Sequence, residues 1–211
     1  MKTKGVLIVI SGFAGAGKGS IVKGLLESYP GKYALSTSAT TRSPRAGEVH
    51  GREYYFLSKE EFEDMIQKDS LIEYANYVGN YYGTPKEYVL KQLEEGQDVI
   101  LEIEVQGALN VRKTFPDALL LFVTPPSATI LEQRLTGRGT ETADVVKKRM
   151  KRAYEESQMM KEYDYLIVND SLEEAIKQTH CMIQNEHYKI DQNHTFIKDL
   201  ETQLNDFYKG E

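Results

Sequence analysis

The sequence predicts an α/β fold in which helices cover both faces of a central parallel sheet, a three-layer core. Four apolar runs lack polar alternation, as strands buried on both faces do, and they lie at residues 6–10, 98–103, 118–123 and 165–168. Stretches with helical spacing of apolar residues separate these runs. An alternating order of strands and helices is typical of a parallel sheet.

The first run opens a strand–turn–helix unit. A glycine-rich turn follows it at once, and residues 18–27 predict a helix that ends at Tyr29-Pro30-Gly31. The apolar residues of this helix have helical spacing: Ile21, Val22, Leu25 and Leu26. We expect residues 1–34 and 91–190 to make up the core.

Two segments interrupt the alternation. Residues 35–90 hold short strands rich in Thr and Tyr, glycines at turns and one helical stretch at 59–68, which predicts a small α+β insertion. Residues 127–160 are helical, basic and broken by Gly137-Arg138-Gly139. Their apolar positions are too sparse to bury the whole length, so we expect a mobile helical lid there.

The tail, residues 191–211, predicts a C-terminal helix with one apolar stripe. Its apolar residues are spaced four, four and three apart: Phe196, Leu200, Leu204 and Phe207. The stripe could pack back on the core or pair with another subunit of a homo-oligomer, and the sequence leaves both arrangements open.

Composition and charge exclude several classes of protein. The 211 residues, 24.0 kDa, correspond to one or two domains, and 40% hydrophobic with 27% charged residues excludes a disordered or collagen-like chain. The 26 basic residues against 32 acidic ones give a net charge of −6, so we expect no nucleic acid as the main partner.

The sequence also predicts a cytoplasmic protein that does not enter a membrane. No apolar run reaches the roughly 18 residues that a spanning helix needs. Glycine breaks the start MKTKGVLIVISG too early for a signal peptide, and Cys181 is the single cysteine, so no intramolecular disulfide can form.

The turn after the first strand has the pattern G-x-x-x-x-G-K, which is typical of a P-loop. Glycines let backbone N–H groups approach phosphate oxygens closely, and the lysine adds a positive charge at the β/γ-phosphates. The position between a buried strand and a helix start favours an anion further. We therefore predict that ATP contacts Gly12, Phe13, Ala14, Gly15, Ala16, Gly17, Lys18, Gly19 and Ser20.

The loop departs from the usual pattern at its end. Gly19 stands where Ser or Thr would bind Mg²⁺, and a hydroxyl comes one residue later at Ser20, our candidate metal ligand. A dinucleotide-binding pattern is excluded, since the third glycine or alanine that it needs is replaced by Ser20. The loop therefore indicates a nucleoside triphosphate.

A second loop offers groups that suit a phosphate monoester. Arg42 and Arg45 lie three apart on a segment stiffened by Pro44 and rich in hydroxyls. Guanidinium groups bind phosphate in a bidentate, charge-assisted way. Solvated surface arginines in a turn would have the same sequence, so this segment alone does not decide between the two.

Several motifs together resemble the guanylate kinase family from about Gly5 to about Glu186. They are STSATTRSPRAGE at 36–48, GREYYF at 51–56, EYA at 73–75, GNYYGT at 79–84, LEIEVQG at 101–107, PPS at 125–127, GRGT at 137–140 and VND at 168–170. The resemblance implies transfer of the γ-phosphoryl group of ATP to GMP with Mg²⁺, in purine nucleotide metabolism. It also implies a core, a GMP-binding insertion and a lid.

The resemblance assigns the GMP-binding residues. The GMP phosphate falls to Arg42, Arg45, Tyr54 and Tyr82, with Glu48 in the same motif. Guanine falls to Glu73, Ser38 and Thr84, because a carboxylate can accept both N1–H and the N2 amino group, a donor pair that adenine lacks.

Glu102 and Glu104 alternate with apolar residues, so both point to one face at a strand end. The family more often has aspartates here. Both are predicted on the GMP side, with Glu104 left open between GMP and the water shell of magnesium. Structural carboxylates that pair with Arg42 or Lys18 are the alternative.

The lid carries the remaining predicted residues. The resemblance places Arg138 and Arg149 on the transferred phosphates, beside Lys18 as catalytic groups, and Arg134 on ATP. Asn169 is predicted to contact adenine, with a helix N-cap role for Asn169 or Asp170 as the alternative. A solvated helix face is expected for the other basic residues nearby: Lys147, Lys148, Lys151 and Arg152.

Two other functions fit parts of the sequence. A guanylate kinase-like interaction module would bind proteins without catalysis, but such a module has no reason to keep Lys18, Arg138 and Arg149. A P-loop kinase with another acceptor would not need the guanine-reading set, which is Ser38, Glu73 and Thr84.

Overall fold

The computed structural model describes residues 4–77, 79–137 and 142–209, and it confirms the predicted α/β core. Within these residues the main sheet has five parallel strands in the order β2-β7-β1-β8-β9. Their bounds are β1 Leu7–Gly12, β2 Tyr33–Leu35, β7 Asp98–Glu102, β8 Leu119–Thr124 and β9 Tyr165–Val168. Only β2 has no counterpart among the predicted strands.

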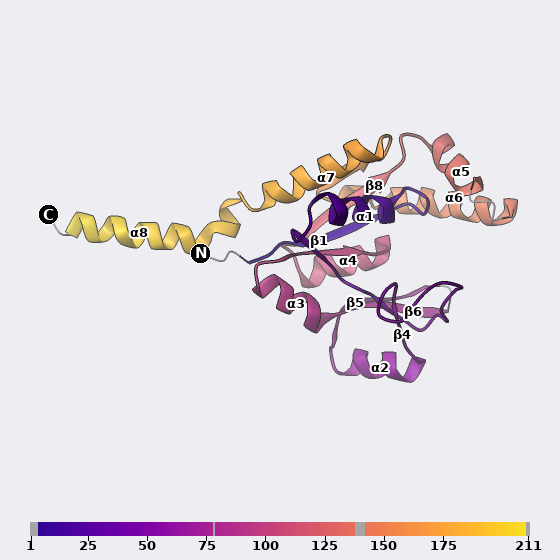
Figure 1. Ribbon diagram of the computed structural model, residues 1–211, viewed down its shortest axis with the longest axis horizontal. Coiled ribbons are helices and arrows are strands. Elements are labelled where there is room, and N and C mark those ends of the chain that lie inside the picture. The colour runs from indigo at the N-terminus through magenta and orange to yellow at the C-terminus, as the bar shows by residue number, and fades with distance from the viewer. Residues whose placement is uncertain (1–3, 78, 138–141, 210–211) are drawn as a thin grey trace.

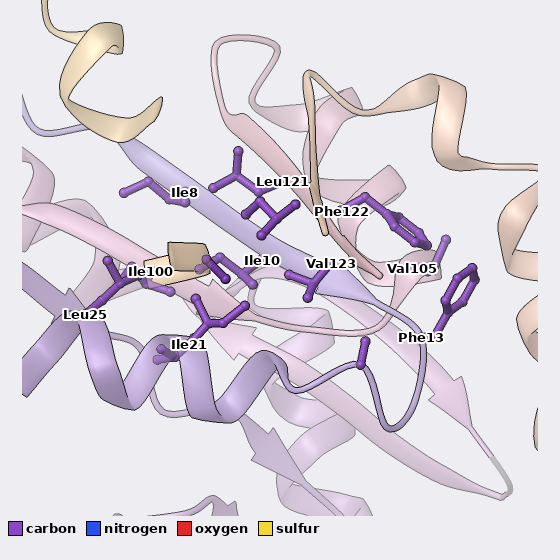
Figure 2. Packing of buried hydrophobic residues seen from close by; sticks show 14 of the residues in the cluster. Ile8, Ile10, Phe13, Ile21, Leu25, Ile100, Val105, Leu121, Phe122 and Val123 are labelled. Carbon is purple, nitrogen blue, oxygen red and sulfur yellow. The ribbon is translucent and has the colours of Figure 1, made fainter. Parts of the chain in front are cut away.

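Both faces of the central strand β1 are covered, so its sequence does not alternate between apolar and polar residues. Ile8 and Ile10 face one side of the sheet and Leu7 and Val9 the other, and all four are at most 6% exposed. Figure 2 shows Ile8 and Ile10 beside side chains of β8 and of α1.

Helices cover the two faces. On one side α1 (Lys18–Ser28) and α7 (Leu172–Glu186) contribute Leu25 and Ile183 to the cluster around Ile8 and Ile10. On the other, α3 (Lys86–Glu94) and α4 (Val105–Thr114) contribute Val89 and Val111. The order of helix, sheet and helix is the expected three-layer arrangement.

A second sheet lies beside α4, in the order β4-β3-β6-β5. Its strands are β3 Ala39–Thr40, β4 Tyr55–Phe56, β5 Leu71–Tyr77 and β6 Asn80–Pro85, and α2 (Lys59–Gln67) covers it. Ser58 and Glu61 form a capping box at the start of α2, and fully buried Phe62 packs on Ala39 and Leu71.

The predicted insertion boundaries need correction. The second sheet ends at Pro85, and residue 90 falls inside α3, whose Val89 and Leu93 are buried in the core. At the other end, Leu35 belongs to β2 of the main sheet. The strands of the insertion therefore lie within residues 39–85.

The predicted lid segment contains α5 (Ala128–Thr136) and α6 (Ala143–Ser157), followed by a short 3-10 turn, Met160–Glu162. The sequence indicates too few apolar residues to bury this segment along its whole length, but three of them pack into the core. Leu131, Leu135 and Val146 are buried in the same hydrophobic cluster as side chains of β1. These two helices lie at one end of the core (Figure 1).

The C-terminal segment forms a 3-10 turn, Ile190–Asn193, and then α8, His194–Lys209. Every residue of α8 is described, and none is buried. Figure 1 shows α8 pointing away from the body of the molecule. Of the two arrangements open for the stripe, packing back on the core is therefore not the one observed. No helix among the described residues is long and apolar enough to cross a membrane.

Candidate active site

The P-loop joins the end of β1 to the start of α1, as predicted. Gly12, Gly15 and Gly17 have φ of 140°, 88° and 95°, which side-chain-bearing residues rarely adopt. A Cβ at Gly12 would lie 2.0 Å from the Val123 carbonyl oxygen, and one at Gly17 would lie 2.3 Å from Nδ2 of Asn169. Glycine is required at both positions by conformation and by space.

Lys18 lies across the mouth of this loop. Its Nζ donates to the carbonyl oxygens of Gly12, at 2.8 Å, and Phe13, at 3.2 Å. Lys18 is also the first residue of α1, so its charge adds to the positive end of the helix dipole. Ser20, the candidate metal ligand, is exposed in the first turn of α1.

Asn169 and Arg134 hold the loop from outside. The Asn169 amide donates to the Ala16 carbonyl oxygen at 2.8 Å, and Asn169 is 6% exposed. Arg134 donates to the carbonyl oxygens of Asn169, at 2.8 Å, and Ala16, at 3.4 Å. The helix-cap alternative for Asn169 or Asp170 is wrong, since the N-cap of α7 is Ser171. Both side chains therefore shape the loop backbone.

On the acceptor side, Arg42 is clamped by Glu48. The two guanidinium nitrogens lie 3.0 Å from the two carboxylate oxygens of Glu48, a bidentate pair. Arg42 NH1 also donates to the backbone carbonyl oxygen of Ser43 at 2.7 Å. Glu48 also accepts from the Arg45 backbone N–H at 2.7 Å. Glu48, predicted to bind GMP, thus orients the arginine loop, and the Arg45 side chain is exposed.

Aromatic rings complete this cluster. The Arg42 guanidinium carbon lies 5.5 Å from the centre of the Tyr54 ring, and the Tyr54 and Tyr82 rings are 6.0 Å apart. Burial raises the pKa of Tyr54, and the hydrogen bond with Glu48 raises that of Arg42. The Tyr54 hydroxyl therefore stays a protonated donor beside a fixed positive charge, a set that suits a phosphate monoester.

Glu73 and Thr84 form a buried pair on the second sheet. Glu73 is 7% exposed, Thr84 is fully buried, and the Thr84 hydroxyl donates to the Glu73 carboxylate at 2.9 Å. Burial raises the pKa of Glu73 to about 7, against the lowering effect of that hydrogen bond. Ser38, the third predicted guanine contact, is half-buried just before β3.

Gly107 contributes to the site although the sequence analysis gave it no role. It is the last residue of the motif at 101–107. It lies in the first turn of α4, and a Cβ there would be 2.7 Å from Oε2 of Glu73. Only glycine therefore leaves the second oxygen of Glu73 room beside α4. The contact joins residues 34 positions apart, so no local pattern could have revealed it.

Glu102 and Glu104 connect the two halves. Glu102 ends β7, and its carboxylate lies 3.5 Å from where a Cβ of Gly19 would be. The position that lacks the usual hydroxyl therefore faces a carboxylate. Loss of surrounding water raises the pKa of Glu102, and the Lys18 charge acts against that rise. The negative charges of both glutamates act on Tyr54.

The expectation for Arg152 was wrong. It does not lie on a solvated face: Nε donates to the buried Glu156 carboxylate at 2.6 Å, and NH2 lies 3.4 Å from Oε2 of Glu104. Arg152 thereby links α6 to the carboxylate of Glu104. Lys147, Lys148 and Lys151 are exposed as expected, Arg149 is half-buried on α6, and Arg138 lies outside the described residues.

A parallel sheet whose central strand continues through a G-x-x-x-x-G-K loop into a helix is the fold of a P-loop nucleotide-binding protein. The family model of guanylate kinase matches residues 4–186. The chain therefore belongs to the guanylate kinase family, whose members are ATP:GMP phosphotransferases.

Individual relatives agree with that membership. The guanylate kinase of Halalkalibacterium halodurans is 52% identical over 188 residues, which cover 89% of this chain and 92% of the relative. That of Streptococcus pneumoniae is 49% identical over 191 residues, 90% and 92% of the two chains. The crystal structure of guanylate kinase from Anaplasma phagocytophilum superposes with a TM-score of 0.74 at 30% identity, over 90% of this chain and 89% of the other.

Proposed function

We propose that this chain transfers the γ-phosphoryl group of ATP to GMP, giving ADP and GDP. The observation that carries the proposal is that Glu102 is close to both groups of predicted phosphate-binding residues. Its carboxylate interacts electrostatically with Lys18 of the P-loop and with Tyr54, whose ring centre lies 5.5 Å from the Arg42 guanidinium carbon.

The acceptor phosphate is bound by the arginine loop and its rings. Arg42, Arg45, Tyr54 and Tyr82 neutralise and orient a phosphate monoester, and the Glu48 clamp keeps Arg42 in place before the substrate arrives. The attacking phosphate oxygen is already ionised near neutral pH, so the transfer requires no general base.

Guanine is read by Glu73 together with Ser38 and Thr84. The ionised Glu73 carboxylate accepts N1–H and the N2 amino group. The Ser38 hydroxyl donates to O6, and the Thr84 hydroxyl would do the same by turning its hydrogen away from Glu73, to which it donates in this structure. Adenine offers no donor pair for Glu73, so it would leave the buried carboxylate without the two hydrogen bonds that guanine supplies, which makes the binding of adenine costly.

Catalysis rests on positive charge around the transferred group. We assign this role to Lys18, Arg149 and Arg138, because phosphoryl transfer proceeds mainly by positioning and charge stabilisation. Arg134 and Asn169 act through the loop backbone that they hold, and the P-loop amides bind the ATP phosphates. Lid closure over both nucleotides excludes water.

The donor groups at the loop suit Mg²⁺. The Ser20 hydroxyl and the Glu102 carboxylate are oxygen ligands of the kind that Mg²⁺ takes beside phosphates and water, and Glu102 faces the position of Gly19. Glu104 remains open between the GMP side and the water shell of the metal. When bound, Mg²⁺ would neutralise charge on the β- and γ-phosphates.

Cytoplasmic location and a place in purine nucleotide metabolism belong to the same proposal. A coupled assay with ATP and a panel of GMP, dGMP, AMP, CMP and UMP tests it. We expect turnover of GMP far above that of AMP. Equal turnover of AMP would exclude the guanine-reading site, and no turnover with any acceptor would favour a binding module.

A further inference from the structure

Arg152 joins two carboxylates that come from different parts of the fold. Its Nε donates to Oε1 of Glu156 at 2.6 Å, and its NH2 lies 3.4 Å from Oε2 of Glu104. Glu156 is one turn further along the same helix, α6, and is only 8% exposed. Glu104 follows β7 at the start of α4. No step of the proposed phosphoryl transfer uses Arg152.

Glu156 fixes the orientation of the Arg152 guanidinium. The two residues are four apart on one helix, and their short contact is charge-assisted. A planar guanidinium that is held at Nε loses little further freedom when NH2 meets a second carboxylate. Arg152 is therefore oriented in advance toward Glu104.

The Glu104 side chain is turned to Arg152 rather than to its own helix. Glu104 is the N-cap of α4, a fully described helix, but its side chain accepts no hydrogen bond from the first turn. Aspartate is a favoured residue at an N-cap, and glutamate is not. The longer side chain reaches α6 instead, so the contact joins the turn between β7 and α4 to the lid segment.

Repulsion would replace this bridge if Arg152 were absent. Burial raises the pKa of Glu156, and the negative charge of Glu104 adds to that rise. The two carboxylates therefore repel each other, and Arg152 is the positive group that contacts both. The charge of Lys18 also acts on Glu156, so the junction lies within electrostatic reach of the P-loop lysine.

The bridge bears on catalysis through Arg149. Arg149 precedes Arg152 by three residues, so the two side chains are neighbours on α6. Val146 and Ala153 attach the same helix to the core by apolar contacts. Such contacts are non-directional, whereas a guanidinium bridge between carboxylates has a fixed geometry. The bridge can therefore set the rotation and height of α6 where Arg149 lies.

We propose that Arg152 is a positioning residue for phosphoryl transfer, which holds α6 against Glu104 and thereby keeps Arg149 in place beside the transferred group. This inference rests on the proposed function, in which Arg149 stabilises the transferred phosphoryl group. Arg152 acts through α6 and need not touch either nucleotide.

Single-turnover phosphoryl transfer, with the enzyme in excess over GMP and with saturating ATP, measures the chemical step. Arg152→Met should slow this step about tenfold, because a small displacement of a charged group weakens its effect on the transition state. The KM for ATP should stay near the wild-type value, since the P-loop is unchanged. Arg152→Lys keeps one positive charge and should recover part of the rate. A wild-type rate in Arg152→Met would overturn the proposal.

Lys151→Met is the matched control. Lys151 is the neighbouring residue on α6, its side chain is 79% exposed, and its Nζ lies 3.9 Å from Oε1 of Glu155. The variant removes the same charge from the same helix and should transfer phosphate at the wild-type rate. An equal loss in both variants would show that the net charge of α6, rather than the bridge to Glu104, is responsible, and the proposal would be wrong.

Glu104→Asp tests the bridge from its other end. The variant keeps the carboxylate but shortens its reach by one methylene group, and the melting temperature should not fall because aspartate caps a helix well. The single-turnover rate should fall about tenfold, and the double variant with Arg152→Met should be no slower than Arg152→Met alone, since both changes break one contact. Losses that multiply in the double variant would mean that the two residues act independently, contrary to the proposal.

Hydrogen exchange gives a readout that needs no turnover. Glu104→Asp and Arg152→Met should both speed exchange of the α6 amides, residues 143–157, while exchange in α7 stays unchanged. Unchanged exchange in α6 would show that the bridge does not hold this helix and would refute the inference. A wild type that transfers no phosphate to GMP would instead refute the proposed function, and the exchange result would still decide whether Arg152 holds α6.

Discussion

The pKa of Glu73 gives a sharp prediction for GMP binding. Burial raises it to about 7, and guanine binds through the ionised carboxylate. A carboxyl with a pKa of about 7 is about one tenth ionised at pH 6 and about nine tenths at pH 8. The KM for GMP should therefore fall about tenfold between these two pH values, measured by initial rates at saturating ATP.

Glu73→Gln is the matched control. The phosphate of GMP itself titrates near pH 6, and this variant keeps that titration while it removes the carboxylate. The ratio of the two KM values, wild type over variant, should change about tenfold from pH 6 to pH 8. Parallel pH profiles for the two proteins would refute the assignment of the base-reading role to an ionised Glu73.

The remaining predictions concern the rest of the site. Because the pKa of Glu73 is raised from 4.5 to about 7 in the folded state, the folded protein loses stability relative to the unfolded chain as the pH rises through this range. Glu73→Gln removes this loss and should raise the free energy of unfolding at pH 8 by up to about 3 kcal/mol, measured by urea titration. At pH 4 the variant should show no gain. Lys18→Ala should lower kcat by about 10²–10³-fold while calorimetry shows unchanged GMP binding, and an unchanged kcat would mean that the loop is misassigned. Gly107→Ala should displace the Glu73 carboxylate and raise the KM for GMP about tenfold. Its melting temperature should be at or above that of the wild type, because alanine favours a helix more than glycine does. An unchanged KM would contradict the steric argument. Arg152→Met leaves the buried Glu156 carboxylate without the Arg152 guanidinium and should lower the free energy of unfolding by about 1–3 kcal/mol at pH 8. The loss should be smaller at low pH, where the Glu156 carboxyl is protonated, and Arg152→Lys should recover part of it. Equal losses at both pH values would argue against the ion pair.

The sequence predicted the parts of the fold that local patterns determine. The buried strands were recognisable because both faces of β1 are covered, so Leu7, Ile8, Val9 and Ile10 are all apolar. The P-loop was recognisable because its backbone conformation requires glycines at fixed positions within one short segment. The insertion boundary was not, since α3 joins the core through Val89, whose partners come from distant strands and helices.

The candidate site divides in the same way. Motif positions indicated Arg42 and Glu73, but the clamp that Glu48 forms depends on the folded loop. The roles of Gly107 and Arg152 depend on contacts across 34 and 48 positions, which spacing within one element cannot reveal.

The specificity ratio between GMP and AMP tests the central claim most directly. The account predicts that kcat/KM for GMP exceeds that for AMP by about 10⁴-fold or more in the wild type, because AMP lacks the donor pair that the buried Glu73 carboxylate accepts from guanine. In Glu73→Gln the ratio should fall by at least about 10²-fold, with the loss mainly in GMP turnover. A wild-type ratio near one, or a ratio unchanged by the substitution, would contradict the account.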